Sequence, residues 1–261
     1  MGFEGLKTMR NKVFHGDCLE IMPNIPDKSV DMILCDLPYG STQCHWDSII
    51  PFEPLWRQYE RIIKNNGAIV LTASQPFTSA LVMSNPRWFK YDWIWEKSRV
   101  TNVLNAKKQP LRCKEDVLIF YPLQPIYNPQ GVSIVNKMVG TGATNANKNG
   151  NCTGKITQTN NGKYFQEIGN YPRQILKFPS DSNTIHPTQK PVALFEYLIK
   201  TYTNEGDVIL DNCAGSFTTA IAAMNTNRDY ICIEQDDTYF ELGCKRIAEH
   251  EQRVVQLEFE I

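Results

Sequence analysis

The chain has 261 residues and is 42% hydrophobic, which is enough for one sizeable α/β core with a smaller appendage. It carries 27 Lys and Arg against 28 Asp and Glu, so a uniformly basic nucleic-acid binder is excluded and any basic surface must be local. No Cys-x-x-Cys pair, secretory leader or apolar run of about 18 residues occurs, which predicts a cytoplasmic protein with no metal site and no membrane span.

Short apolar runs recur along the chain and end at polar or turn residues. Such runs are typical of strands that are buried on both faces of a largely parallel sheet. We predict strands at Ser29–Cys35, Gly67–Thr72, Tyr91–Trp95, Asp116–Tyr121, Asp207–Leu210 and Asp229–Ile233. Apolar residues at helical spacing over 55–63 and 194–202 predict helices, the second with Pro191 in its first turn. The alternation of strands and helices indicates an α/β fold with a doubly wound, mostly parallel sheet.

The stretch 124–171 differs from the rest because it is rich in Asn, Gly, Thr and Lys and lacks sustained periodicity. We predict a loop-rich insertion there, although a disordered surface excursion would have the same composition. Its centre, Gly140–Asn161, is expected to be mobile without a ligand. The segments on either side, 1–123 and 172–261, then form two halves of one domain.

The first group of residues suited to chemistry, Asp36-Leu37-Pro38-Tyr39, directly follows a predicted strand. The carboxyl ends of strands are where open α/β sheets bind ligands. Because proline ends the strand pairing, the Pro38 carbonyl can face a cleft beside the Asp36 carboxylate. These two acceptors could hold the N–H groups of an exocyclic base amine while Tyr39 stacks on the extruded base. An ordinary strand-ending turn would use the same residue types.

A second group of residues lies between Asp211 and Glu234. A predicted strand leads into a turn of small residues with one glycine, Gly215, then into an apolar helix at 220–224 and a strand that ends in Glu234. This is the βαβ layout of a nucleoside site, in which the terminal acid bonds the ribose hydroxyls. The G-x-G-x-x-G pattern of pyrophosphate sites is absent, so an adenosyl cofactor without phosphates fits better. The alternative is an α/β unit that binds nothing.

With both groups in place, the sequence resembles the amino-methyltransferases of DNA, in particular the group whose catalytic motif precedes the cofactor motif. The D-P-P-Y motif of that family corresponds to 36–39, and its D-P-F-x-G-S-G-T-T loop corresponds to 211–219. The segment 186–191, His-Pro-Thr-Gln-Lys-Pro, is similar to the family's H-P-T-x-K-P motif. The resemblance implies a Rossmann-like methyltransferase fold, S-adenosylmethionine as cofactor, and DNA methylation, as in restriction–modification, as the activity.

The resemblance also implies roles for single residues. Asp36, Leu37, Pro38 and Tyr39 would form the target-base site. The implied contacts of S-adenosylmethionine are Asp17, Asp36, Thr188, Lys190, Asp211, Cys213, Gly215, Ser216 and Glu234. Asp17 has an equally good interpretation as the cap of a helix.

Two positions depart from the motifs of the family. Leu37 replaces the first proline of D-P-P-Y, which leaves the carboxylate, the carbonyl and the aromatic ring in place. Phe217 replaces the second glycine of G-S-G-T-T, where a benzyl group would narrow the cofactor cleft or change the turn. A DNA-binding protein with an impaired cofactor site is therefore an alternative to an active enzyme.

A local basic tract lies between Lys97 and Lys114, and no Asp or Glu occurs from Ser98 through Lys114. Clustered cations of this kind neutralise phosphates, although a solvated loop could also carry them. The predicted contacts to double-stranded DNA are Lys97, Arg99, Asn105, Lys107, Lys108 and Arg112. The insertion is the predicted target-recognition region, with cations at Lys148, Lys155 and Lys163.

These observations predict a DNA methyltransferase acting on N6 of adenine, since an Asp in the first motif position favours adenine in the family. N4 of cytosine, an RNA base and a protein glutamine stay open because they present similar N–H groups to the two acceptors. The resemblance is compatible with a homodimer. For methyl transfer to occur, Asp36 and Asp211 must lie at adjacent strand ends and open into a common pocket.

Overall fold

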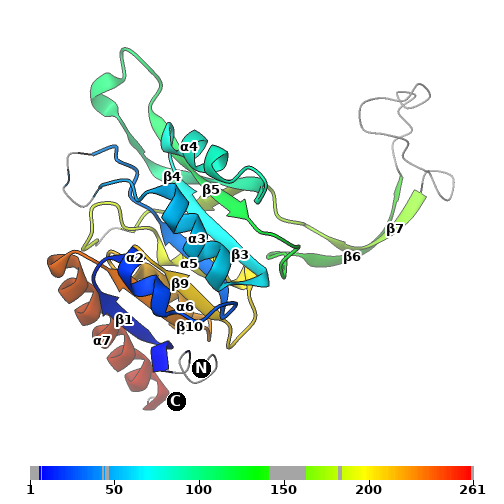
Figure 1. Ribbon diagram of the computed structural model, residues 1–261. Coiled ribbons are helices and arrows are strands. Elements are labelled where there is room, and N and C mark those ends of the chain that lie inside the picture. The colour runs from blue at the N-terminus through cyan, green and yellow to red at the C-terminus, as the bar shows by residue number, and fades with distance from the viewer. Residues whose placement is uncertain are drawn as a thin grey trace. The chain divides into compact units, whose positions relative to one another are not determined.

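The computed structural model describes residues 6, 8–42, 44, 47–140, 163–181 and 184–259 (Figure 1). The described strands are β1 (Lys12–His15), β2 (Val30–Asp36), β3 (Ile63–Ala73), β4 (Phe89–Thr101), β5 (Arg112–Phe120), β6 (Ser133–Gly140), β7 (Lys163–Gly169), β8 (Ile175–Phe178), β9 (Val208–Asp211) and β10 (Asp229–Glu234). The helices are α2 (Cys18–Ile21), α3 (Phe52–Ile62), α4 (Phe77–Ser84), α5 (Val192–Tyr202), α6 (Thr218–Asn225) and α7 (Asp237–Phe259), with the 3₁₀ turns η1 (Met22–Asn24) and η2 (Val103–Asn105).

The central sheet has the order β1-β10-β9-β2-β3-β5-β4-β8. Its pairs are parallel except at β5, which runs antiparallel to both β3 and β4. In this sheet β2 and β3 lie next to β9 and β10, which come much later in the chain. Because these four strands are parallel, their carboxyl ends meet at one edge of the sheet. In open α/β sheets this edge is where ligands bind.

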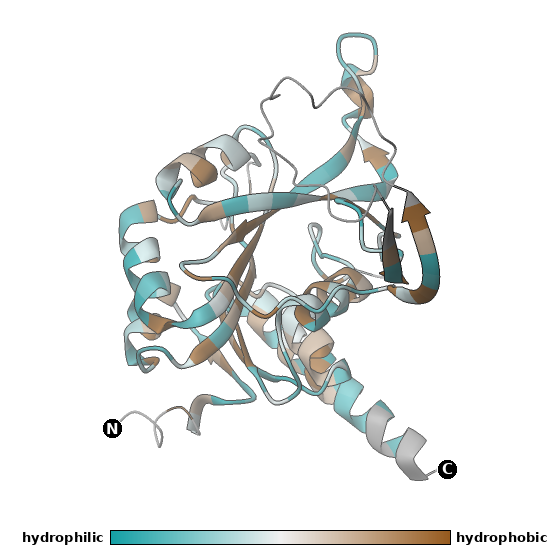
Figure 2. Ribbon diagram, turned by 90° about the vertical axis from the view of Figure 1, so that its right-hand side faces the viewer, coloured by the Kyte–Doolittle hydropathy of each residue, from teal (hydrophilic) through white to brown (hydrophobic). Residues whose placement is uncertain are grey.

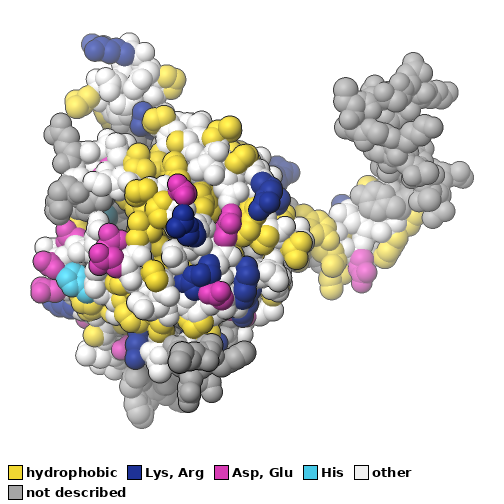
Figure 3. Space-filling model, viewed as in Figure 1, with side chains coloured by type: hydrophobic (Ala, Val, Ile, Leu, Met, Phe, Trp, Pro, Cys, Tyr) yellow, Lys and Arg dark blue, Asp and Glu magenta, His cyan; other side chains and the backbone are white. Residues whose placement is uncertain are grey.

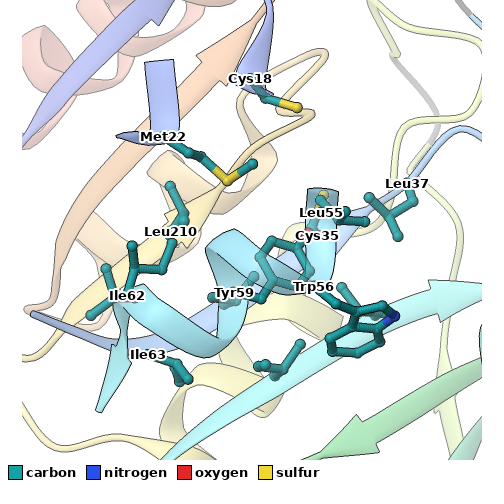
Figure 4. Close-up of a cluster of buried hydrophobic side chains, with 14 of the residues drawn as sticks. Cys18, Met22, Cys35, Leu37, Leu55, Trp56, Tyr59, Ile62, Ile63 and Leu210 are labelled. Atoms are coloured by element: carbon teal, nitrogen blue, oxygen red, sulfur yellow. The ribbon is translucent and has the colours of Figure 1, made fainter. Parts of the chain in front are cut away.

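Helices cover both faces of this sheet, as a doubly wound fold requires. Alternate residues of β2 point to opposite faces, so Ile33 and Cys35 join a core with α2, α3 and α4. Met32 and Leu34 join a second core with α5, α6 and α7. Figure 4 shows the first core, where side chains of α3 pack against the sheet, and Figure 2 shows apolar strands between more polar helices. The predicted α/β class with a doubly wound, mostly parallel sheet is confirmed.

All six predicted strands are present, as β2, β3, β4, β5, β9 and β10, and the predicted helices correspond to α3, α5 and α6. Ile63 was expected in a helix but begins β3, because the chain turns directly from α3 into the sheet. Pro191 is the cap before α5 rather than part of its first turn. β1 and β8 carry no clear strand signal in the sequence, because they are four-residue strands at the two edges of the sheet, where one neighbour is missing and apolar patterning is weak.

Residues Pro129–Arg173 form a compact unit of their own, whereas Met1–Asn128 and Gln174–Ile261 together form the other. The smaller unit contains an antiparallel hairpin of β6 and β7, in which Met138 pairs with Phe165. These strands are not predictable from alternating polarity, because a register shift between Ile134 and Lys137 interrupts their period of two. The expected mobility of the centre of the insertion, and the cations at 148 and 155, concern residues outside the described part, as does the side chain at 163.

Candidate active site

Asp36 and Asp211 end two neighbouring parallel strands. β2 pairs with β9, with Met32 opposite Ile209 and Ile33 opposite Leu210, so both chains leave the sheet at the same edge. A cavity of about 290 Å³ opens there, and both Asp36 and Gly215 line it. The spatial prediction that the two motifs share one pocket is therefore confirmed.

The predicted catalytic and cofactor residues come from both halves of the main unit and converge on this cavity. They line it without exception: Asp17, Asp36, Leu37, Pro38, Tyr39, Thr188, Lys190, Asp211, Cys213, Gly215, Ser216 and Glu234. Their individual roles toward a base or a cofactor stay predictions. The cavity also has lining residues outside the predicted motifs, among them Asp47, Gln235 and Tyr239.

The carboxylate of Asp36 is held by side chains from three other positions. The hydroxyl of Tyr39 donates to Oδ1 at 2.7 Å, and the hydroxyl of Thr72, near the end of β3, donates to the same oxygen. The ammonium group of Lys190 contacts Oδ2. Since each carboxylate oxygen has two lone pairs, Oδ2 keeps one for a further N–H donor. Thr72 could have been found from the sequence, because it ends a predicted strand at the same sheet edge.

Lys190 belongs to a charge network beneath Asp36. Its side chain is only 4% exposed, and its Nζ also lies 3.3 Å from Oε2 of Glu115, which in turn contacts Lys97. Burial alone would lower the pKa of Lys190, but the two carboxylates outweigh it and the pKa is raised. Two cations and two anions thus balance one another, and Asp36 remains a fixed acceptor. A role of Lys190 at the methionine end of a cofactor stays a prediction.

Lys97 is a predicted DNA contact whose ammonium group is engaged within the protein. Its side chain is largely buried, its ammonium group contacts Glu115, and it lies 5.3 Å from the ring centre of Trp95. Its charge is neutralised within the protein, so it is not available to neutralise a phosphate. Sequence reasoning missed this because Glu115 lies outside the acid-free stretch and meets Lys97 only through the pairing of β4 with β5.

Asp47 fixes the loop that follows Asp36. Its Oδ1 accepts the backbone N–H of Tyr39 at 2.7 Å and of Gly40 at 2.9 Å, and its Oδ2 accepts those of Ser41 and Thr42. Burial would raise the pKa of this carboxyl, but the hydrogen bonds outweigh that effect and the pKa is lowered. Asp47 is a positioning residue that no sequence pattern singles out, since its partners are backbone groups of this loop and the side chain of Thr42.

Glu234 closes the other end of the cavity at the tip of β10. Its Oε2 accepts the N–H of Gly215 at 2.6 Å and its Oε1 accepts that of Asp236 at 2.8 Å, so the side chain is held in one orientation. Burial raises its pKa. Asp17 lies on the same cavity and also caps α2 through the N–H of Leu19 at 2.7 Å, so the two interpretations of Asp17 are compatible.

Asp211 shapes the loop between β9 and α6. Its Oδ1 accepts the N–H of Cys213 at 3.1 Å and its Oδ2 accepts the hydroxyl of Thr219 at 2.5 Å. Burial raises the pKa of this carboxyl to about 7. The next residue, Asn212, accepts the hydroxyl of Tyr59 on α3 at 2.5 Å, which ties the loop to the helix layer on the opposite face. Thr188 and Ser216 likewise use their hydroxyls within the protein.

Phe217 does not narrow the cavity. It adopts the left-handed conformation, with φ of 53°, that the glycine of the family motif would supply, so the turn is kept. Its ring is fully buried in the core of α5, α6 and α7, packs edge-on against Phe240, and is absent from the cavity lining. The reason for expecting an impaired cofactor site is thereby removed.

The remaining predicted DNA contacts lie on the β4–β5 hairpin. Arg99, Lys107, Lys108 and Arg112 are exposed. Asn105 is half-buried, and its amide donates to Oδ1 of Asn102 at 2.7 Å, so it holds the tip of the hairpin together. Among the described residues no cluster of three or more His, Cys, Asp or Glu side chains suits a metal ion, and none of the helices could span a membrane.

The donor set of the cavity fits a nucleoside with a charged amino-acid tail. Carboxylates of Glu234 and Asp17 suit ribose hydroxyls and an adenine amine, and the wall between them is formed by small residues and thiols. No phosphate is required, since the loop carries one glycine and the adjacent cation, Lys190, is already paired. These features fit an S-adenosylmethionine molecule at the end of β9 and β10.

Comparisons with known proteins agree with this geometry. The family model of the N6/N4 methyltransferases, described as DNA methylase, matches residues 30–245. DNA adenine methyltransferase YhdJ of Escherichia coli K12 is 28% identical over 254 residues, which cover 90% of this chain and 82% of YhdJ. Type II methyltransferase M.HinfI of Haemophilus influenzae is 25% identical over 284 residues, with coverage of 94% and 70%.

Solved structures share the fold. The M1.HpyAVI–SAM complex has a TM-score of 0.60 at 24% identity and covers 90% of this chain and 98% of its own. The PvuII DNA methyltransferase, which is cytosine-N4-specific, has a TM-score of 0.64 at 14% identity, with coverage of 95% and 93%. The chain thus belongs to the N6/N4 DNA methylase family, and it is an S-adenosylmethionine-dependent DNA methyltransferase.

Proposed function

We propose that this enzyme methylates N6 of adenine in double-stranded DNA. The observation that carries the proposal is the shared cavity, in which Asp36 and Pro38 stand at the end of β2 beside the Gly215 turn and Glu234. The Asp in the first motif position and the resemblance to an adenine methyltransferase, YhdJ, favour adenine over cytosine.

The proposed mechanism uses the residues around Asp36. The carboxylate of Asp36 and the carbonyl of Pro38 each accept one N–H of the extruded adenine, which turns the nitrogen lone pair toward the methyl donor. As positive charge develops on that nitrogen, the Asp36 carboxylate stabilises it until the methylated amine has lost one N–H proton to solvent. Tyr39, whose hydroxyl holds Asp36, offers its ring to the base. When bound, S-adenosylmethionine supplies an electrophilic methyl group on a sulfonium.

In the same proposal, cofactor contacts are distributed over the far side of the cavity. Glu234 would bond the ribose and Asp17 the adenine amine, while Thr188 and Ser216 would hold the methionine part of the cofactor. Asp211 acts through Thr219 and the backbone of Cys213 by keeping the loop in shape. Gly215 presents its backbone N–H to Glu234 and so places that carboxylate.

Product identification tests the choice of base. DNA methylated by the enzyme is digested to nucleosides, and N6-methyl-2′-deoxyadenosine is expected, whereas N4-methyl-2′-deoxycytidine would show that cytosine is the substrate. Labelled methyl transferred to RNA or to protein, but not to duplex DNA, would overturn the proposal altogether.

A variant pair tests the role of Asp36. Asp36→Asn keeps the shape beside Lys190 but removes the charge, so turnover should fall by several orders of magnitude while S-adenosylmethionine still binds in calorimetry. Asp36→Ala should abolish turnover as well, and wild-type rates in either variant would contradict the mechanism. Absence of any heat with the wild-type protein would instead favour a protein that only binds DNA.

We infer that the unit formed by 129–173 contributes to target recognition, because its described hairpin exposes Lys137 and several apolar side chains.

We also propose a homodimer, which analytical ultracentrifugation of the full chain tests. A cytoplasmic location accords with the free thiols of the cysteines that the structure describes, since the cytoplasm keeps thiols reduced.

A further inference from the structure

The β4–β5 hairpin extends beyond the sheet edge that carries the active site. Thr72 pairs with Asp36 on one side and with Val117 of β5 on the other, so Val117 lies level with the catalytic carboxylate. From Val117 to Arg112, β5 continues for five more residues, which amounts to about 15 Å at the usual rise of a strand. β2 and β5 are separated by two strand spacings, or about 10 Å. The hairpin therefore stands beside the cavity and above it.

The tip of this hairpin is an ordered turn. Asn102 adopts the left-handed conformation, with φ of 68°, and its side chain accepts the amide N–H of Asn105 at 2.7 Å. Backbone N–H groups of Asn105, Ala106 and Lys108 bond carbonyls within the same turn at 2.8–3.1 Å. The turn consequently holds the side chains between Asn102 and Asn105 in a fixed direction.

The side chains at the tip are apolar and exposed. Leu104 is 102% exposed and Val103 is 62% exposed, which means that Leu104 has essentially no contact with the rest of the described protein. The same hairpin carries four exposed cations, namely Arg99, Lys107, Lys108 and Arg112, and no acid occurs from Ser98 through Lys114. In Figure 3 dark blue and yellow side chains gather at the tip of the projection above β4.

This combination matches one kind of partner. Duplex DNA carries a negative charge about every 1.7 Å along its axis, so four exposed cations with no acid between them in the sequence complement its phosphates. Proteins that kink or open a duplex insert Leu, Ile, Phe or Met side chains between bases while cations bind the flanking phosphates. Duplex DNA is thus the occupant that the charge of the hairpin favours.

We infer that Leu104 is a wedge that enters the base stack of duplex DNA beside the target nucleotide. The four cations hold the flanking phosphates, and Leu104 fills space that the extruded base leaves, so that the base stays in the cavity next to Asp36. This inference rests on the proposed function, because it assumes a base that must leave a duplex before it is methylated.

The test compares two leucine-to-alanine variants on two DNA substrates. Leu104→Ala removes the wedge. Leu123→Ala is the matched control, since Leu123 is 62% exposed and follows β5 at the opposite edge of the sheet. The target site is first read from the modified bases in DNA treated with the wild-type enzyme. Methylation rates are then measured on a duplex with the target base paired and on one with an abasic site opposite it.

On the paired duplex, Leu104→Ala should lower kcat/KM roughly tenfold or more, because extrusion then lacks the compensating contact. On the abasic duplex, where the target base is already unpaired, Leu104→Ala should approach the wild-type rate. Leu123→Ala should behave like wild type on both. Full activity of Leu104→Ala on the paired duplex, or an equal loss of kcat/KM on both substrates, would contradict the inferred role of Leu104 as a wedge. If the wild-type enzyme methylated neither duplex, the proposed function itself would fail.

Discussion

The ring of Phe217 occupies the space that a side chain at position 243 would need. A Cβ placed on Gly243 of α7 would lie 2.0 Å from Cδ2 of Phe217 and 2.5 Å from Cε2. A residue that replaces a motif glycine in the cofactor loop is therefore accommodated by a glycine in a helix 26 positions later, and the loop keeps its left-handed turn. The two positions should be energetically coupled.

Gly243→Ala tests this coupling. Alanine normally stabilises a helix by about 1 kcal/mol relative to glycine, but here overpacking against Phe217 should lower the free energy of unfolding by about 1–3 kcal/mol. Urea denaturation of the four members of a double-mutant cycle with Phe217→Gly measures the coupling. Adding Phe217→Gly should remove the penalty at 243, and additive effects of the two substitutions would contradict the packing argument.

The pairing of Lys190 with two carboxylates predicts a large effect of removing its charge. Lys190→Met leaves Asp36 and Glu115 without their shared cation, so unfolding free energy should fall by about 3–5 kcal/mol and methylation should slow. Lys190→Met combined with Glu115→Gln should recover part of the stability. The matched control is Lys177→Met, which breaks an exposed pair with Glu96 and should change stability by less than about 1 kcal/mol. Equal losses of unfolding free energy in the Lys190 and Lys177 variants would contradict the role of this charge network in stability.

Asp47→Asn tests whether the backbone of the catalytic loop depends on this carboxylate. An amide cannot accept four N–H groups, so the loop around Tyr39 should loosen and kcat should fall about tenfold, while the affinity for S-adenosylmethionine changes less. Because the folded-state pKa of Asp47 is lowered, its contribution to stability is present at neutral pH and is lost as pH falls through that pKa. The wild-type and variant proteins should therefore converge in stability in acid, and a constant difference at all pH values would count against this role.

Asp211 predicts the opposite dependence on pH. Its folded-state pKa of about 7 exceeds the unfolded value of 3.8, so the folded protein binds the extra proton between these values and loses stability as pH rises through them. Asp211→Asn should flatten the stability profile between about pH 4 and 7 by up to a few kcal/mol. Thermal unfolding of both proteins across this range is the measurement, and parallel profiles would show that Asp211 is ionised throughout.

The salt dependence of DNA affinity distinguishes exposed cations that contact phosphates, such as Lys107 and Lys108, from Lys97, which is paired within the protein. Each phosphate contact contributes about 0.9 to the slope of log K against log salt, so Lys107→Ala with Lys108→Ala should reduce the slope by about 2. Lys97→Ala should leave the slope unchanged and instead lower stability, because its charge is paired with Glu115. Fluorescence anisotropy at several salt concentrations distinguishes the two. A slope that fell with Lys97→Ala would return that residue to the DNA-binding surface.

The sequence by itself determined six strands of the central sheet, the order of the motifs and the chemistry that the motifs could support. Apolar runs such as the one from Val30 to Cys35 are local patterns that can be recognised without knowledge of the fold. The residue that ends such a strand lies at the carboxyl edge of the sheet, because parallel strands all point the same way. The three motifs identified part of the cavity lining for the same reason, because a motif is a short contiguous segment that carries its own turn geometry.

Only the tertiary structure decided which groups meet Asp36 and how Phe217 fits. Lys190 is 154 positions from Asp36, Thr72 and Glu115 come from other strands, and Asp47 acts on backbone groups that have no sequence signature. Gly243 has meaning only once α7 lies against the cofactor loop. Burial and charge pairing depend on distances between segments, and those distances exist only after the sheet has brought the two halves of the chain together.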